Sequence, residues 1–390
     1  MTNSHPTVAL RSPSPNATPR RLAVALAGFA MITSAFAQPR YVVTDLGTLP
    51  GMTISMASSL NDRGDVVGAA APSETGYATG FVWRNGIMTS TGKLPKGLYS
   101  YANDINAQGV IVGDGDTGDG RPQSWVSSAK GLVNFFPNNG GNTHTVGIND
   151  AGTICGYYTK SLSGWVSSWK ASIWTVDPKD SRKYRQVDLP VLMGPDPTFK
   201  GTAAIPAAFN QTGQVAGYAQ NEIIGQHACF WNNDAAHTIV DLGVFPGDWS
   251  SLAYGMNDFG QVVGSSHPPF GSRPVVWNND AAHTPSELPV LPGDNSGAAT
   301  AINNLGQAIG ASYYSTPGTW DATPSRLVVW RDGGVLELQA VLDAAPGAGW
   351  TLTSATAINN LGQIVGSGIH NGQTRAFLLT PVMPQPISVQ

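Results

Sequence analysis

Residues 60–68 read Leu-Asn-Asp-Arg-Gly-Asp-Val-Val-Gly, and close copies of this phrase return along the whole chain. Each copy has an apolar residue, Asn, two variable residues, Gly, one variable residue, two mostly apolar residues and Gly. There are seven copies, 43 to 61 residues apart, with asparagines at Asn61, Asn106, Asn149, Asn210, Asn257, Asn303 and Asn359. An interval of this length is typical of one supersecondary unit repeated side by side.

We call each copy an Asn-box and interpret it as a β-hairpin. The residues before the box alternate and are small, with an alanine four positions before the asparagine in five copies, at Ala57, Ala102, Ala253, Ala299 and Ala355. Small side chains suit a strand close to a crowded axis. The asparagine can hydrogen-bond the backbone two residues on, and the first glycine can adopt a positive φ. The seven asparagines are therefore predicted to be structural and not catalytic.

A third strand in each repeat is expected to carry a large aromatic residue. Six repeats have a tryptophan there, at Trp83, Trp125, Trp174, Trp231, Trp277 and Trp330, and the seventh has Phe-Leu-Leu at 377–379. Because such rings bury a large area, one fixed position for them predicts packing between neighbouring repeats. Ligand stacking is the alternative.

A fourth strand ends in a Leu-Pro-Gly or Phe-Pro-Gly turn, as at 45–51, 241–247 and 287–293. Pro-Gly suits the central positions of a type II turn. The repeats begin with an unpaired fourth-type strand at 41–47 and finish after a third-type strand at 375–379. We therefore predict an all-β, closed seven-bladed β-propeller in which the N-terminal strand completes the last blade. Closure removes free sheet edges, and an open solenoid would need capping repeats that the sequence lacks.

The first 37 residues have the features of a secretory signal. Arg20 and Arg21 precede an apolar run at 22–33, and small residues follow at 34–37. An uncleaved anchor is the alternative, but the run is shorter than the roughly 20 residues that a spanning helix needs. Cleavage after Ala37 would leave 38–390 as a single repeat domain. No later segment is apolar enough to cross a membrane, so we expect a secreted or periplasmic protein.

The composition narrows the classes of partner. Only 12% of residues are charged, the net charge is −4, and no basic run is present. Nucleic acid and anionic membranes are therefore not expected partners. The 46 glycines and 28 prolines indicate short strands joined by tight turns. We expect a monomer that binds an extracellular glycan or protein.

The two cysteines, Cys155 and Cys229, lie in different repeats and in different strand positions. Two buried thiols are the simpler interpretation. A disulfide is the alternative, because an exported protein could form one.

The Asn-box, the tryptophan-bearing strand and the Asp-Leu-Gly-x-Leu-Pro-Gly segment together resemble the extracellular HAF-repeat family of bacteria. The closest matches to the His-Ala-Phe run of that family are at 227–231 and 375–377, and most other repeats depart from those letters. The resemblance covers about residues 41–380 and implies an exported repeat protein. It brings no activity or catalytic residue with it.

A metal site is one candidate for chemistry. Residues 114–120 read Asp-Gly-Asp-Thr-Gly-Asp-Gly, and carboxylates on a glycine-rich loop can converge on Ca²⁺. The predicted ligands are Asp114, Asp116 and Asp119. The match is imperfect, because the third aspartate falls one place late and no closing glutamate follows. A solvated hairpin tip is the alternative, and no other cofactor is expected.

Two insertions break the period and carry exposed-aromatic candidates for ligand binding. One holds Trp165 and Trp169, the other holds Trp320, and Trp350 follows further on. Loops on a rigid scaffold often carry function, and indole faces can stack on sugars. The alternative is that these rings pack on the blades beneath them.

No nucleophile elbow, phosphate-binding glycine loop or zinc-spaced histidine pair is present. We therefore expect an exported binding or interaction module for an extracellular or envelope ligand. The alternative is a hydrolase or lyase acting on an extracellular polymer in the central channel, where Asp104 is the one inner-strand carboxylate beside a box. A purely structural surface protein is a third alternative.

Overall fold

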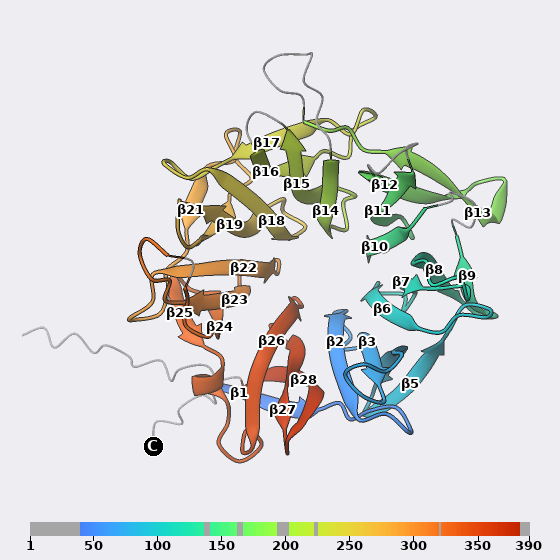
Figure 1. Cartoon of the computed structure of the whole chain (residues 1–390), viewed down its shortest axis with the longest axis horizontal. Coiled ribbons are helices and arrows are strands. Elements are labelled where there is room, and N and C mark those ends of the chain that lie inside the picture. Colours follow the sequence, from blue (N-terminus) through green and yellow to red (C-terminus); the bar gives the residue numbers. More distant parts are fainter. Residues whose placement is uncertain are drawn as a thin grey trace, which may run out of the picture. The chain divides into compact units, whose positions relative to one another are not determined.

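The computed structural model describes residues 40–135, 141–161, 167–192, 203–221, 225–319 and 321–382. Residues Gln38–Gln390 form one compact unit. The unit consists of seven four-stranded antiparallel sheets, the blades, arranged around a central axis (Figure 1). The predicted seven-bladed propeller is confirmed. The predicted signal peptide, 1–37, lies outside the described residues.

The blades follow one another along the chain, and in each the first strand lies nearest the axis (Figure 1). The strands of blades 1 to 4 are β2 (Ile54–Leu60), β3 (Val66–Ala71), β4 (Thr79–Arg84), β5 (Ile87–Gly92); β6 (Ser100–Ile105), β7 (Ile111–Gly115), β8 (Gln123–Ser128), β9 (Gly131–Asn134); β10 (Thr143–Ile148), β11 (Ile154–Ser161), β12 (Ser167–Asp177), β13 (Asp180–Asp188); β14 (Ala203–Phe209), β15 (Val215–Asn221), β16 (Gly225–Trp231) and β17 (Ile239–Gly243).

The remaining blades include the N-terminal strand. The strands of blades 5 to 7 are β18 (Ser250–Met256), β19 (Val262–His267), β20 (Arg273–Trp277), β21 (Pro285–Glu287); β22 (Ser296–Ile302), β23 (Ala308–Tyr313), β24 (Arg326–Arg331), β25 (Gly334–Glu337); β26 (Trp350–Ile358), β27 (Ile364–His370), β28 (Gln373–Val382) and β1 (Arg40–Asp45). Between blades 6 and 7 lies a short 3₁₀ turn, η1 (Gln339–Val341).

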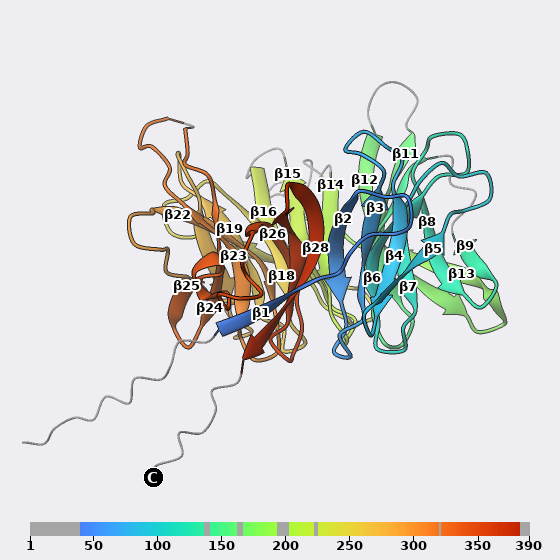
Figure 2. The ribbon, with the colours of Figure 1, turned by 90° about the horizontal axis from the view of Figure 1, so that it is seen from below.

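The ring closes through the N-terminal strand, as predicted. The order of the last sheet is β1-β28-β27-β26, with Tyr41 opposite Pro381 and Asp45 opposite Phe377 (Figure 2). Tyr41 and Val43 are buried in the core of this blade. The first and last described strands thus hold each other in place.

The Asn-boxes are turns at the end of the inner hairpins, and their structural role is confirmed. Oδ1 of Asn61 accepts the backbone N–H groups of Arg63 and Asp65 at 3.1 Å, and Gly64 has a φ of 78°. Nδ2 of Asn61 donates to the carbonyl of Asn106 in the next blade at 3.1 Å. Equivalent links at 2.9–3.1 Å join five further pairs of boxes: 106 to 149, 210 to 257, 257 to 303, 303 to 359, and 359 to 61.

The second glycine of each box has a packing role that the sequence analysis did not foresee. A β-bulge in β2, between Ala57 and Ser59, brings the carbonyl of Met56 over Gly68. A Cβ on Gly68 would lie 2.1 Å from that oxygen. All seven second glycines show such an approach, at 1.9–2.2 Å. Only glycine fits this position without a shift of the backbone.

The predicted packing of the tryptophans in the core is confirmed. The prediction that they share one fixed position in the third strand is wrong. Trp231 and Trp277 face Val215 and Val262, whereas Trp125 lies two residues nearer the start of its strand and faces Gly113. There the ring covers the bare glycine, whose Cβ would lie 2.5 Å from Cζ2 of Trp125. Five of the six rings are buried, and Trp83 is half-buried.

The cysteines are buried free thiols, in agreement with the simpler prediction. Cys155 and Cys229 belong to one hydrophobic cluster between blades 3 and 4. Burial raises the pKa of both thiols well above the usual value. In the part of the chain that the structure describes, no helix has the length and apolarity to cross a membrane.

Candidate functional site

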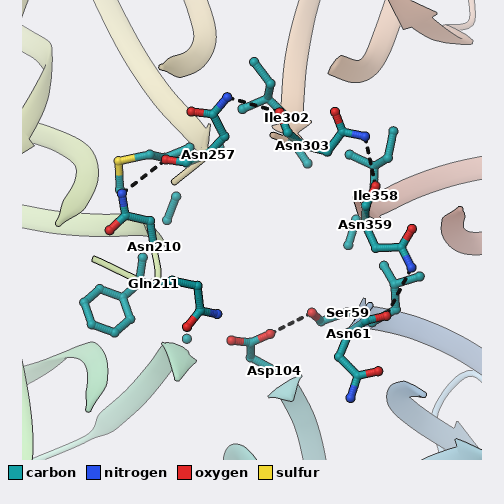
Figure 3. Close-up of a pocket in the computed structure, with 18 of the residues that line it drawn as sticks. Ser59, Asn61, Asp104, Asn210, Gln211, Asn257, Ile302, Asn303, Ile358 and Asn359 are labelled. Carbon is teal, nitrogen blue, oxygen red and sulfur yellow. Dashed lines mark hydrogen bonds between the residues drawn. The ribbon is translucent and has the colours of Figure 1, made fainter. Parts of the chain in front are cut away.

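The inner strands surround a central channel of about 510 Å³. One end is formed by the Asn-boxes, and hydrogen bonds from the box asparagines join six of the seven neighbouring pairs there (Figure 3). We call the opposite end, where the second strand of each blade leads into the third, the loop end. Among the described residues of the channel wall the carboxylates are Asp62, Asp104, Asp150 and Asp258, and Lys, Arg and His are absent.

Asp104 is the channel carboxylate that belongs to an inner strand. Oδ1 accepts a hydrogen bond from Ser59 at 2.7 Å (Figure 3). Oδ2 accepts the backbone N–H of Ile148 at 2.9 Å. Loss of hydration raises the pKa of this half-buried carboxyl, and the nearby negative charge of Asp150 adds to the rise. Asp104 therefore bridges three blades while both of its oxygens are occupied.

The other three channel acids lie one residue after an asparagine of a box. Their Oδ1 atoms accept backbone N–H groups from the preceding blade, with Asp150 bound by Ala107 at 2.8 Å and Asp258 by Gln211 at 2.9 Å. Asp62 accepts the N–H of Asn360 at 2.9 Å in the same way. These carboxylates therefore form a second ring of contacts that joins the blades.

A second cavity, of about 460 Å³, opens at the loop end over blades 1 to 3. Three tyrosines line it: Tyr77 from the β3–β4 connection, Tyr99 from the β5–β6 connection and Tyr101 from β6. Tyr77 is 61% exposed and Tyr101 is 41% exposed. Burial, and then the charges of Asp116 and Asp114, raise the pKa of Tyr99 to about 12. Its hydroxyl is protonated at neutral pH and can donate a hydrogen bond. We call this space the aromatic cavity.

The far wall of the aromatic cavity holds a histidine that a carboxylate fixes in place. Oδ2 of Asp114 lies 3.2 Å from Nδ1 of His144 and accepts a hydrogen bond from Asn103 at 3.0 Å. Oδ1 accepts the N–H of Thr145 at 2.9 Å. A carboxylate only accepts, so in the neutral form of the imidazole the proton lies on Nδ1 and Nε2 is an acceptor.

Two further rings extend the wall behind His144. The imidazole stacks on Tyr157 with the centroids 5.0 Å apart and the planes 28° apart. Trp169 meets the edge of Tyr157 at 5.2 Å and lies 6.3 Å from His144. Both Tyr157 and Trp169 are half-buried, so the stack presents a partly exposed aromatic surface.

The structure places the predicted calcium ligands in different settings. Asp114 holds His144, whereas Oδ1 of Asp116 accepts the N–H groups of Leu98 and Tyr99 at 2.6 and 3.1 Å. Burial alone would raise the pKa of Asp116, but these backbone donors outweigh burial and lower it. Asp119 is exposed and accepts the N–H of Arg121 at 3.1 Å. Among the described residues, no group of three or more His, Cys, Asp or Glu could hold a metal ion. The calcium site stays a prediction.

The predicted ligand-binding tryptophans are also dispersed. Trp169 joins the stack behind the aromatic cavity, whereas Trp165 and Trp320 lie outside the described residues. Trp350 is only 5% exposed and packs face to face on His370, with centroids 4.5 Å apart, and edge-on to Phe377. Its role in binding stays a prediction. Of the seven predicted site residues, Asp114 and Trp169 both lie close to His144.

The sequence analysis missed His144, Tyr77, Tyr99 and Tyr101. Tyr101 and His144 both lie five positions before the asparagine of a box, in the stretch that the sequence predicted to alternate and to be small. The equivalent residue is Ala298 in blade 6 and Ser354 in blade 7. The other equivalent residues are Met56, Ile205 and Leu252, in blades 1, 4 and 5. Aromatic rings in two adjacent blades, where the remaining blades carry aliphatic or small side chains, were the available signal.

Comparisons with known proteins identify neither a family nor a function for the chain. No protein-family model matches the chain, and no curated protein matches it either. The propeller domain of the Trilobed protease from Pyrococcus furiosus is similar in structure, with a TM-score of 0.49 and 10% identity over 87% of this chain and 99% of that one. For an acylaminoacyl peptidase from Pyrococcus horikoshii the TM-score is 0.46, with 12% identity over 83% of this chain and 52% of that one. For a lectin from Aleuria aurantia it is 0.33, with 14% identity over 75% and 97%.

Proposed function

We propose that this chain is an exported binding module that holds a neutral glycan in the aromatic cavity. The observation that carries the proposal is the position of His144, fixed by Asp114 and backed by Tyr157 and Trp169. It faces a cavity that Tyr99 and Tyr101 also line. Aromatic faces pack on the apolar faces of sugar rings, and a few fixed polar groups orient the hydroxyls.

The charges around the cavity favour a neutral ligand. Asp114 is the one carboxylate among the described lining residues, which include no Lys or Arg. An anionic sugar would meet this negative charge without a compensating cation. A neutral sugar can instead donate a hydroxyl hydrogen to Nε2 of His144 and accept one from Tyr99.

Export is part of the same proposal. It is supported by the signal-like segment at 1–37 and by the resemblance of the repeats to the extracellular HAF-repeat family. Binding outside the cell also agrees with the lack of a basic run in the sequence, which disfavours nucleic acid as a partner.

A hydrolase or lyase acting in the channel is the second candidate function. The raised pKa of Asp104, with Asp150 nearby, favours it, because cleavage of a glycosidic bond uses one protonated and one ionised carboxyl group. Binding remains the better-supported function, because Ser59 and Ile148 already occupy both oxygens of Asp104.

The test is a binding screen of the unaltered chain against neutral and anionic polysaccharides, with and without EDTA. Tyr101→Ala and His144→Ala are the informative variants, because blade 6 already has Ala298 at the equivalent position. Phe259→Ala is the matched control. Phe259 is a 63% exposed ring in the Asn-box turn of blade 5, at the opposite end of the ring.

We expect a neutral polysaccharide to bind and each site variant to bind about tenfold more weakly or worse, as for loss of a central aromatic contact. The control should bind like the unaltered chain. If the polysaccharide is degraded, and if Asp104→Asn abolishes this degradation, the hydrolase or lyase function would be favoured. Loss of binding in EDTA would favour calcium. Absence of binding to any polysaccharide would refute the proposal.

A further inference from the structure

A third cavity, of about 310 Å³, lies at the loop end between blades 5 and 6. Tyr254 from β18, His267 from β19 and Tyr313 from β23 contribute the rings, and all three are half-buried. Ser265, Ser272 and Ser315 supply hydroxyl groups. The aromatic cavity and this one lie on opposite sides of the channel, over β6 and β10 and over β18 and β22 (Figure 1).

The polar groups of this third cavity are held by hydrogen bonds, as those of the aromatic cavity are. Oγ of Ser265 lies 2.7 Å from Nε2 of His267, and Oγ of Ser272 lies 2.7 Å from the hydroxyl of Tyr313. Ser272 also donates its hydroxyl hydrogen to the carbonyl of Gly297 at 2.7 Å. Its oxygen therefore accepts the hydrogen bond from the hydroxyl of Tyr313. A sugar hydroxyl would therefore meet groups that are already oriented.

The two cavities occupy the same place in the repeat. Ser265 follows the asparagine of its box by eight residues, as Asp114 does, and Tyr254 precedes it by three, as Asn103 does. Ala298 lies at the repeat position that His144 occupies in the aromatic cavity. The third cavity therefore takes its aromatic surface from Tyr254 and His267 of blade 5. The aromatic cavity takes its surface from Tyr101 of blade 2 and His144 of blade 3.

We propose that the cavity formed by Tyr254, His267 and Tyr313 is a second glycan site, which makes the chain bivalent for a neutral polysaccharide. The proposal rests on the proposed function of the aromatic cavity. The described lining residues of the third cavity include no Asp, Glu, Lys or Arg, so a neutral saccharide meets no unpaired charge there. Burial lowers the pKa of His267, against the opposing charge of Asp248, which favours the uncharged imidazole.

Two sites at one end of a rigid ring have a functional consequence. A polymer that reaches both cavities binds the second one intramolecularly, and avidity can exceed either single affinity by roughly 100-fold or more. Short oligosaccharides would occupy the sites independently. The chain would therefore retain long polymers in preference to their fragments.

The test is isothermal titration of the full-length mature chain with maltohexaose, cellohexaose and laminarihexaose, followed by the parent polymers. Tyr101→Ala removes the first site. Tyr254→Thr removes the second, and it is mild because blades 6 and 7 carry Thr300 and Thr356 at the equivalent position. Circular dichroism checks the fold of each variant, and Phe259→Ala is the control at the far end of the ring.

We expect a hexasaccharide to bind with a stoichiometry of two in the unaltered chain and the control, one in each single variant and none in the double variant. Affinity for the polymer should fall roughly 100-fold in either single variant. A stoichiometry of one that Tyr254→Thr leaves unchanged would overturn the second site while sparing the first. Absence of saccharide binding to the unaltered chain would refute both sites.

Discussion

The side-chain amide of Asn359 donates to the backbone carbonyl of Asn61 at 3.1 Å, across 298 residues of sequence. This bond closes the inner ring of the propeller, independently of the N-terminal strand that closes the outer edge. The last blade is thus fastened to the first at the axis, and to the N-terminal strand at the rim.

The first prediction concerns this closure. Asn359→Asp keeps the shape of the side chain but turns its Nδ2 atom, which donates to Asn61 and Gln363, into an oxygen facing two oxygens. We expect a loss of about 2–4 kcal/mol in the free energy of unfolding, as for a buried hydrogen-bond network that is broken. Urea denaturation measures it. Leu361→Ala, a 60% exposed neighbour, should change stability by less than about 0.5 kcal/mol, and an equal loss in both variants would contradict the assignment.

The second prediction concerns the bulge glycines. A Cβ on Gly366 would lie 1.9 Å from the carbonyl oxygen of Ser354, so Gly366→Ala must displace the inner strand. We expect a loss of at least roughly 2 kcal/mol. Gly334→Ala is the control, because its Cβ would meet only the carbonyl of Arg331, at 3.7 Å. Similar unfolding midpoints for the two alanine variants would show that the backbone yields at the bulge.

The repeat allowed most of the fold to be predicted, because each box carries its own turn chemistry. The asparagine, the first glycine and the Pro-Gly turn act locally, and the unmatched strands at the two ends, 41–47 and 375–379, indicated how the ring closes. The second glycine could not be explained in the same way. Its reason is the bulge in the neighbouring strand, which is a property of the paired hairpin.

The candidate site was harder to predict, because its residues come from different blades. Tyr77, Tyr101 and His144 are separated by dozens of positions and meet only when the inner strands converge at the loop end. Asp114 was singled out for its neighbours in the loop, but its partner is His144 on the next blade. Two residues that meet across the boundary between blades belong to different repeats, so no sequence spacing within one repeat reveals their contact.

The third prediction concerns the pH dependence of stability. The folded-state pKa of Asp104 is raised by burial, so folding favours the protonated carboxyl, and its contribution to stability falls as pH rises above the unfolded value. Asp104→Asn cannot ionise and can still accept from Ile148 and donate to Ser59. We expect the variant to gain stability relative to the unaltered chain as pH rises from about 4 to about 7. Urea denaturation across this range measures the gain.

Asp332→Asn is the control for that comparison, because this carboxyl is 85% exposed and forms an ion pair with Arg331 on the surface. The difference between Asp332→Asn and the unaltered chain should be small and nearly flat with pH. A stability difference for Asp104→Asn that stays flat, or that falls as pH rises, would contradict a raised pKa at Asp104.

The fourth prediction concerns the thiols. Cys155 and Cys229 are buried and free, and burial raises the pKa of both, so little thiolate is present to react. We expect a thiol-specific disulfide reagent at pH 8 to label the folded chain only slowly and to titrate both thiols at once in denaturant. Fast labelling of the native chain would contradict the packing between blades 3 and 4. If the reagent detects no free thiol in denaturant, Cys155 and Cys229 are joined in a disulfide.

The central claim is that the loop end holds a neutral glycan between blades 1 and 3. The most direct measurement is a crystal structure of residues 38–390 soaked with the neutral hexasaccharide that binds most tightly in the titration. We predict sugar rings in the cavity between Tyr101 and His144, within hydrogen-bonding distance of Nε2 of the imidazole. A hexasaccharide found in the channel beside Asp104, with the aromatic cavity empty, would contradict the account.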